Sequence, residues 1–163
     1  MTKEEKVALG RHSMPGYELD LVAYKGKQNE IMVVECKSYL DSPGVHAEGF
    51  ENPKSRKAKR YKLFNDRVLW KTVRRALRRR LVKDGRCGSR PKIRLCLAAG
   101  HVVNAEHRTR IKRIFNRHKS WELMDDHKIV REIKNLASKG YMNNEAVMVA
   151  KILERFVESD SSE

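Results

Sequence analysis

Two stretches of the sequence decide the fold: YELDLVAY at residues 17–24 and IMVVECK at residues 31–37. In the first, apolar residues recur at every second position, and in the second they form an unbroken run over residues 31–34. The polar segment GKQN at residues 26–29 separates the two. This pattern predicts two β-strands joined by a short turn, a β-hairpin.

The rest of the chain predicts helices and one further central strand. At most one short helix is expected within residues 1–16, and the Pro and Gly residues within residues 38–59 predict a long loop. Apolar residues at helical spacing over residues 60–82 predict a long helix. The remaining elements are a buried strand at 92–99, a short strand at 121–124, and three helices that begin after Asn104, after Asp125 or Asp126, and after Asn143 or Asn144. We therefore expect an α/β protein with a mixed central sheet flanked by helices and a helical C-terminal part.

The length of 163 residues is that of one ordinary domain. We expect a single domain over residues 1–158, with a short N-terminal segment at residues 1–16 and a disordered tail at residues 159–163. Cys36 and Cys96 lie in apolar, strand-like runs, which predicts buried reduced thiols in a cytoplasmic protein. The sequence has neither a signal-peptide pattern nor an apolar run long enough to cross a membrane.

The charge is strongly positive, with 36 Lys and Arg against 21 Asp and Glu, a net charge of +15 and a pI near 10.0. Such a charge favours nucleic acid as the partner, although a membrane surface or an acidic protein would be attracted by the same field. The arginines of residues 74–80 have no acidic residue four positions away to pair with, which favours a bound polyanion. The candidate nucleic-acid-binding residues lie in the loop and on the long helix: Lys54, Arg56, Lys57, Lys59, Arg60, Arg74, Arg75, Arg78 and Arg79.

Few aromatic residues accompany these charges. Tyr61, Phe64 and Trp70 are expected in the core, not as platforms on which bases stack. Contact with the backbone of a duplex is therefore expected, and double-stranded DNA is the predicted partner.

The hairpin also carries the candidate chemistry. Residues two apart in a strand point to the same face, so Glu18 lies with Asp20, and Glu35 with Lys37. If the strands pair with these faces on one side, three carboxylates and one ammonium group converge. Hard carboxylate oxygens suit magnesium, and a nearby lysine can orient a water molecule or neutralise developing charge. The alternative is that Glu35 and Lys37 form an ordinary surface ion pair at the end of a half-buried strand.

The hairpin resembles the active-site hairpin of the PD-(D/E)xK, or restriction-endonuclease-like, nuclease superfamily. The similarity is carried by GYELDLVA at residues 16–23 and VVECKS at residues 33–38. It is greatest to members with a G-x-E-x-D-h-h-h strand before h-h-E-x-K, where h is apolar. The resemblance implies a restriction-endonuclease-like core that hydrolyses phosphodiester bonds of DNA with Mg²⁺ or Mn²⁺. By position, it implies Asp20 and Glu35 as metal ligands, Lys37 as the catalytic lysine and Glu18 as an auxiliary catalytic carboxylate.

One departure from the superfamily concerns the N-terminus. Its members usually place a helix and a strand before the Asp-bearing strand, and residues 1–16 are too few for both at full length. Either these elements are reduced, or the chain is part of a larger protein or assembly. A homodimer is also expected by analogy, because enzymes that cut duplexes often use two centres. Two other functions stay open: a catalytically inactive nucleic-acid-binding module of the same fold, and a basic protein-interaction domain.

The histidines give no further site, because none of the six shows zinc-ligand spacing. His46 lies near the Glu-x-Lys pair in sequence, as do Asp41 and Ser42, and a structural or surface role is favoured for all three.

Overall fold

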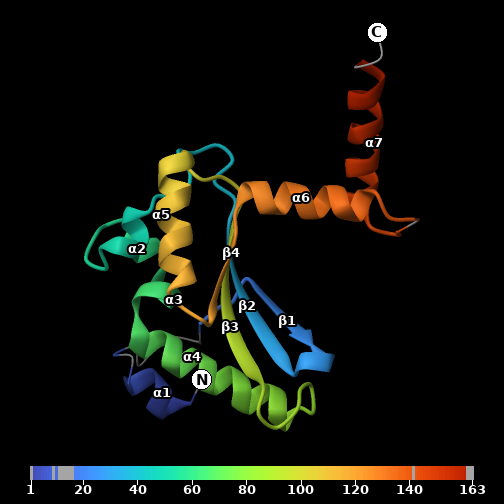
Figure 1. Ribbon diagram of the computed structural model, residues 1–163. Coiled ribbons are helices and arrows are strands. Elements are labelled where there is room, and N and C mark those ends of the chain that lie inside the picture. Colours follow the sequence, from blue (N-terminus) through green and yellow to red (C-terminus); the bar gives the residue numbers. More distant parts are fainter. Residues whose placement is uncertain (1, 9, 11–16, 141, 161–163) are drawn as a thin grey trace.

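The computed structural model describes residues 2–8, 10, 17–140 and 142–160 (Figure 1). Its elements follow the predicted alternation of strands and helices, which confirms the α/β class. In chain order they are α1 (Lys3–Ala8), β1 (Leu21–Lys25), η1 (Gly26–Gln28), β2 (Glu30–Lys37), α2 (Glu48–Glu51), η2 (Ala58–Arg60), α3 (Lys62–Asn65), α4 (Arg67–Lys83), β3 (Lys92–Ala99), α5 (Ala105–Asn116), β4 (Trp121–Met124), α6 (Asp126–Ala137) and α7 (Glu145–Asp160).

The four strands form one mixed sheet in the order β1-β2-β3-β4. β1 is antiparallel to β2, whereas β2, β3 and β4 run parallel to one another. The apolar run predicted at residues 92–99 is β3, with the predicted bounds, and it lies between β2 and β4. Its position between two strands explains its mostly apolar sequence: Ile93, Leu95, Leu97 and Ala99 are buried, as is Cys96.

The first strand of the hairpin is shorter than predicted. β1 begins at Leu21, so Tyr17 to Asp20 lie before it instead of within it. All five of its residues are exposed, as expected at the edge of a sheet. Asn29 closes the turn with a left-handed φ of 45°, a conformation that asparagine tolerates better than most residues.

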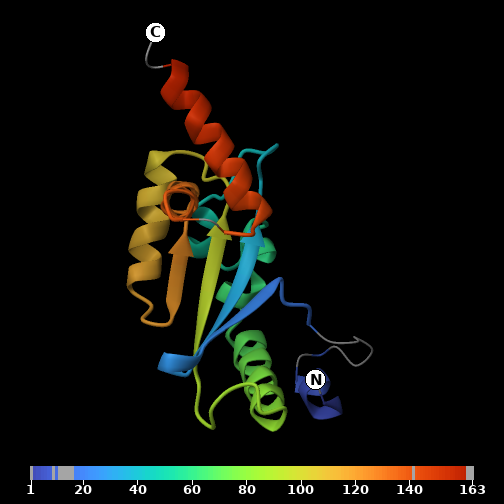
Figure 2. The same cartoon turned by 90° about the vertical axis from the view of Figure 1, so that its right-hand side faces the viewer.

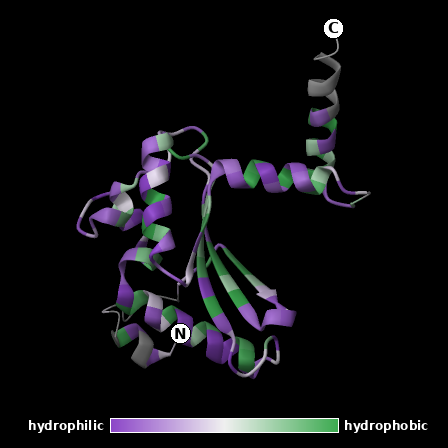
Figure 3. Cartoon of the chain, viewed as in Figure 1, coloured by the Kyte–Doolittle hydropathy of each residue, from purple (hydrophilic) through white to green (hydrophobic). Residues whose placement is uncertain are grey.

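Helices α2 to α5 cover one face of the sheet (Figure 1). The core lies in this layer, where the inward-facing side chains of β2 and β3 pack against those of α3, α4 and α5. Tyr61 and Phe64 are buried as predicted, whereas Trp70 is half-buried. The largest buried side chains of this core include Ile31, Leu63, Leu69, Leu95, Leu97 and Ile111. Figure 3 shows the hydrophobic residues concentrated on the strands and hydrophilic residues over much of α4.

The predicted loop over residues 38–59 is largely packed against the body of the protein. It contains α2 and η2, and Val45, Ala47 and Phe50 are buried. Val45 forms a parallel bridge with Val102, which follows β3. The chain after β3 also lies close to the chain after β2 at Gly100, whose N–H donates to the Lys37 carbonyl (2.8 Å). Only glycine permits this approach, because a β-carbon at Gly100 would lie 2.5 Å from the Ser38 oxygen. The end of β2 is therefore fixed against the end of β3.

The long helix predicted over residues 60–82 is divided in two. Asp66 ends α3 and caps α4, and its carboxylate accepts a hydrogen bond from the Leu69 N–H (2.9 Å). An aspartate in an extended conformation satisfies a free N–H at a helix start, so it favours a new helix over continuation of the old one.

The second face of the sheet is not covered by α2 to α5 (Figure 2). Arg94 on β3 lies between Glu30 on β2 and Glu122 on β4, and its guanidinium is 3.9 and 3.4 Å from the two carboxylates. These charges make this face compatible with water. Cys36 also lies exposed, so its predicted burial was wrong, whereas Cys96 is buried as predicted.

Helix α6 begins directly after β4 and contacts β3 and β4, and α7 extends away from its far end (Figure 1). Asn104, Asp125 and Asn144 each accept a hydrogen bond from a backbone N–H near a helix start, as predicted. Helix α7 extends to Asp160, so it includes the first two residues of the predicted disordered tail. The rest of that tail, residues 161–163, lies outside the described residues.

Candidate functional site

Asp20 and Glu35 meet where β1 begins and β2 nears its end. The register pairs Leu21 with Val34, so one further step places Asp20 opposite Glu35. The side chain of Asp20 is anchored there, because its Oδ2 accepts a hydrogen bond from the backbone N–H of Cys36 (2.7 Å). The hairpin therefore brings the two predicted metal ligands to the same end of the same strand pair.

Lys37 lies on the same face of β2 as Glu35. Its Nζ is 2.7 Å from Glu35 Oε1, and the side chains of both residues are largely shielded from water. Glu35 is only 9% exposed, and within β2 it directly follows the apolar residues 31–34. A buried carboxylate is unfavourable unless it is paired, and Lys37 supplies that pairing. The surface ion pair considered from the sequence alone does not describe this geometry.

Glu18 is not brought into this cluster. It lies three residues before β1 and is exposed. It forms no hydrogen bond or ion pair with any other described residue. The prediction that three carboxylates converge is therefore reduced to two, Asp20 and Glu35.

The donor set is compatible with a hard divalent cation. Magnesium is often bound through one or two carboxylates, with water and phosphate oxygens completing its shell. Asp20 and Glu35 meet that minimum. Among the described residues, no group of three or more His, Cys, Asp or Glu side chains is arranged to hold a metal ion. A metal held by these two carboxylates would need water or phosphate oxygens for the rest of its shell.

Cys36 separates Glu35 from Lys37 in sequence but does not share their chemistry. Desolvation raises the pKa of its thiol, and the carboxylates of Asp20 and Glu35 raise the pKa further. A raised pKa disfavours the reactive thiolate. Cys36 contributes its backbone N–H to the site, not a nucleophile.

Two tyrosines beside the pair were not predicted as site residues. Tyr39 has a left-handed φ of 48°, which is uncommon for a bulky residue. Burial raises the pKa of the Tyr61 phenol, and the adjacent Tyr39 hydroxyl and the Glu35 carboxylate raise the pKa further. Tyr61 therefore remains a neutral phenol near Glu35. No sequence pattern indicates a positive φ at a tyrosine, so this part of the site was missed.

A basic pocket of about 350 Å³ is lined in part by Tyr61, whose pKa the Glu35 carboxylate helps to raise. Three of the predicted nucleic-acid-binding residues line it: Arg56, Lys57 and Arg60. Arg60 also lies over the ring of Tyr39, with its guanidinium carbon 5.9 Å from the ring centroid. Ser42 and His46 line the same pocket, although a structural or surface role was favoured for both.

The pKa of His46 is lowered by its surroundings in this pocket. Its Nδ1 lies 3.3 Å from Lys57 Nζ, and Lys57 also pairs with Glu48 (2.9 Å). Burial, Lys57 and His107 lower the pKa of His46, and Glu48 opposes them. His46 is therefore held neutral beside a lysine, as a hydrogen-bonding group in a positive pocket.

The predicted basic residues of α4 form an exposed surface on the helical side of the sheet (Figure 1). One prediction about it was wrong: Arg80 does have an acidic residue four positions away, and its Nε lies 3.8 Å from Asp84 Oδ2. Arg74, Arg75 and Arg78 have no acidic partner within the described residues. Most of this surface charge is therefore uncompensated. Lys54 and Lys59 are likewise exposed, beside the basic pocket in sequence.

The fold is that of an α/β protein with a mixed four-stranded sheet. Its site is the group formed by Asp20, Glu35 and Lys37 at the end of the antiparallel strand pair. No protein-family model, curated protein or solved structure matches the chain. Within the described residues, no helix is both long enough and apolar enough to cross a membrane.

Proposed function

We propose that this protein is a metal-dependent endonuclease of the PD-(D/E)xK type that hydrolyses phosphodiester bonds of DNA. The observation that carries this proposal is the convergence of Asp20, Glu35 and Lys37 at one end of the β1–β2 pair. Sequence spacing alone does not require that convergence. It results from a register that places Asp20 beside Cys36 and opposite Glu35.

Each residue has a role that its contacts support. Asp20 is oriented by the Cys36 N–H, and Glu35 is held by Lys37, so both carboxylates are positioned before any ligand binds. A bound Mg²⁺ or Mn²⁺ would polarise the phosphodiester and lower the pKa of a water molecule. Lys37 can then release Glu35 to orient that water or to neutralise charge on the phosphate.

The topology supports the restriction-endonuclease-like assignment in part. An antiparallel strand pair is followed by a helix, α4, and then by a strand parallel to the second of the pair, as in that superfamily. The helix and strand expected before the Asp-bearing strand are represented by α1 alone among the described residues. Residues 11–16 lie outside the described residues.

Double-stranded DNA is the proposed substrate because of the charge around the site. The basic pocket beside Tyr61 and the arginines of α4 offer cations to phosphates on the helical side of the sheet. A homodimer would supply a second centre for the opposite strand.

A catalytically inactive DNA-binding module is the second candidate. The finding that favours it is the small number of acidic groups: two carboxylates, with no group of three metal-ligating side chains among the described residues. The same basic surfaces would serve such a module. A basic protein-interaction domain would use these surfaces for an acidic protein, and failure to bind DNA even at about 50 mM salt would favour it.

Incubation with supercoiled plasmid tests the proposal. With Mg²⁺ or Mn²⁺ the protein should nick or linearise the plasmid, and with EDTA it should not. Lys37→Ala should lower the rate by about 100-fold or more, as when one charge-stabilising group is removed from an active site. Thermal unfolding of the variant would show whether its fold is retained.

Lys25→Ala is the matched control, because it removes the same charge from the opposite end of the hairpin. It should cut like the unchanged protein. Equal degradation by every variant would identify a contaminating nuclease and refute the proposal. Plasmid binding without cleavage under all metal and salt conditions would support the inactive module.

A further inference from the structure

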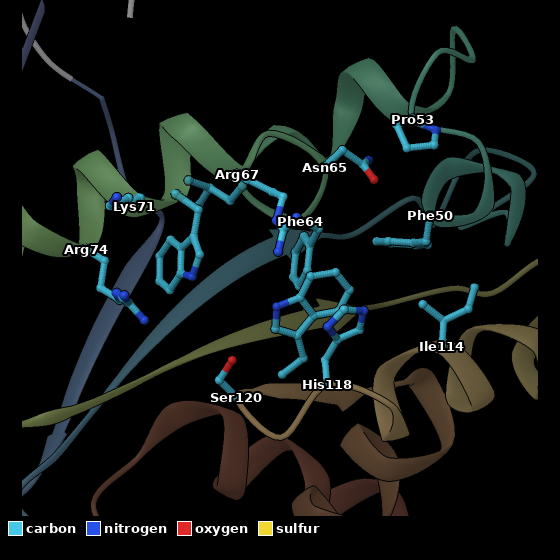
Figure 4. A pocket seen from close by; sticks show the side chains of 13 residues that line it. Phe50, Pro53, Phe64, Asn65, Arg67, Lys71, Arg74, Ile114, His118 and Ser120 are labelled. Carbon is cyan, nitrogen blue, oxygen red and sulfur yellow. The ribbon is translucent and has the colours of Figure 1, made fainter. Parts of the chain in front are cut away.

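A second pocket, of about 720 Å³, lies away from the Glu35–Lys37 pair. It is bordered by α3 and α4 on one side and by the connection from α5 to β4 on the other (Figure 4). None of Asp20, Glu35 and Lys37 lines it, and none of the residues that line the basic pocket does either. Its volume lies within the range of small-molecule sites.

Aromatic rings form the wall of this pocket. Trp121 packs edge-on against the buried Phe64, with ring centroids 5.1 Å apart. The exposed His118 ring stacks on Trp121 at 3.8 Å with an interplanar angle of 21°. Trp70 lines the pocket from α4 and is half-buried, so part of its ring is accessible. The wall thus offers planar faces to a further planar ring.

Cations line one side of the pocket. Arg67, Lys71 and Arg74 lie on α4 at helical spacing and border the pocket there (Figure 4). All three are exposed, and none has an acidic partner within the described residues. Within the part of the chain that the structure describes, no acidic residue lines the pocket. An aromatic wall with an uncompensated cationic rim is complementary to a base that carries a phosphate.

We propose that this pocket binds an unpaired nucleotide of the nucleic acid, with its base on the aromatic wall and its phosphate at the cations of α4. The inference rests on the proposed function for the identity of the polymer, and it adds to the duplex substrate a binding site for an unpaired nucleotide at an end, flap or loop. Trp70 packs partly against the core, as predicted, and also lines this pocket. A paired base is stacked within its duplex and cannot reach such a wall.

The occupant is part of a strand and not a free nucleotide. Arg75 and Arg78 continue the row of cations along α4 beyond the pocket. A single mononucleotide does not use these charges, whereas the next phosphates of a strand can.

The chain provides its own probe of this pocket. It contains two tryptophans, Trp70 and Trp121, and both line the pocket, so tryptophan emission reports on it directly. The full-length protein is titrated in EDTA, at about 50 mM salt, with a hairpin duplex that carries a single-stranded adenine tail. Stacking of a base should quench the emission. The blunt hairpin and a hairpin with an abasic tail should bind through their phosphates and leave the emission nearly unchanged.

Trp70→Leu tests the contact itself. It should weaken binding of the tailed hairpin by about 10-fold, within the range for loss of one stacked base, and leave the blunt hairpin unaffected. Val68→Ala is the matched control, because Val68 is an exposed apolar residue of α4 that does not line the pocket. Thermal unfolding of both variants would verify the fold.

Three results would overturn the inference: equal quenching by the blunt or abasic hairpin, unchanged affinity of Trp70→Leu for the tailed hairpin, or equal quenching by free AMP. Binding is measured without metal, so it does not depend on cleavage. A protein that cuts plasmid without tail-dependent quenching keeps the proposed function and loses this inference. A protein that shows tail-dependent quenching but does not cut plasmid keeps this inference and loses the proposed function.

Discussion

Glu35 shows why a short motif can be informative at the scale of single residues. Its inward-facing neighbours on β2, Ile31 and Val33, are fully buried, and a carboxylate in line with them needs a partner. Strand periodicity predicts that Glu35 and Lys37 share a face, whereas Asp20, which lies before β1, was predicted beside them through the resemblance of the hairpin to the nuclease superfamily. Tyr39 and Tyr61 could not, because their positions depend on a backbone turn and on a loop that packs against the sheet.

His46 gives a prediction at this scale, about the pH dependence of stability. Lys57, His107 and Glu48 face it, and its pKa in the folded protein is lower than its ordinary value of 6.5. As the pH falls below that value, the unfolded chain takes up a proton before the folded one does, so the free energy of unfolding decreases. His46→Gln should remove this part of the decrease.

Urea unfolding at a series of pH values from about 7.5 to 5 would measure the effect. His127→Gln, at an exposed position on α6, is the control and should leave the profile unchanged. The carboxylates Asp125 and Asp126 do not interfere. Their ion pairs with Lys112 and Arg108 outweigh burial and hold each pKa below the ordinary value of 3.8, so their contribution is lost at lower pH. Identical profiles for His46→Gln and the unchanged protein would show that His46 is not perturbed.

At the scale of elements, apolar periodicity located the helices and strands, and capping residues decided where they end. β3 was predicted with its bounds because its apolar run stops at Gly100. The prediction of one long helix was wrong at Asp66. The apolar pattern continues across this residue, but Asp66 caps a new helix, α4, and so ends α3. The alternation around Leu19 extended the predicted first strand too far, since the pairing with β2 begins only at Leu21.

The arginines of α4 give a prediction at this scale. The double variant Arg75→Gln with Arg78→Gln should reduce the slope of log affinity against log salt by about 0.9 for each phosphate contact that is lost. Fluorescence anisotropy with labelled duplex DNA at several salt concentrations would measure the slope. Arg131→Gln with Lys134→Gln removes the same charge from α6 and should leave the slope nearly unchanged. An equal loss in the two double variants would indicate attraction by net charge and not by the surface of α4.

At the scale of the whole molecule, the sheet is covered by α2 to α5 on one face and carries cross-strand charges on the other (Figure 2). Sequence alone predicts helices beside the sheet but does not predict that Glu30, Arg94 and Glu122 lie side by side on one face. That arrangement depends on the register of three strands. The carboxyl ends of the parallel strands, the loop after β2 and the start of β1 meet at one region, and the Glu35–Lys37 pair lies there.

We propose that this region holds a divalent metal between Asp20 and Glu35. A crystal structure of the protein soaked with Mn²⁺, with anomalous scattering to locate the ion, tests this proposal directly. We expect an ion within about 2.0–2.4 Å of an oxygen of each carboxylate, and no ion there in Asp20→Asn. Manganese that binds elsewhere on the protein, while Glu35 remains paired with Lys37 and Asp20 with the Cys36 N–H, would contradict it.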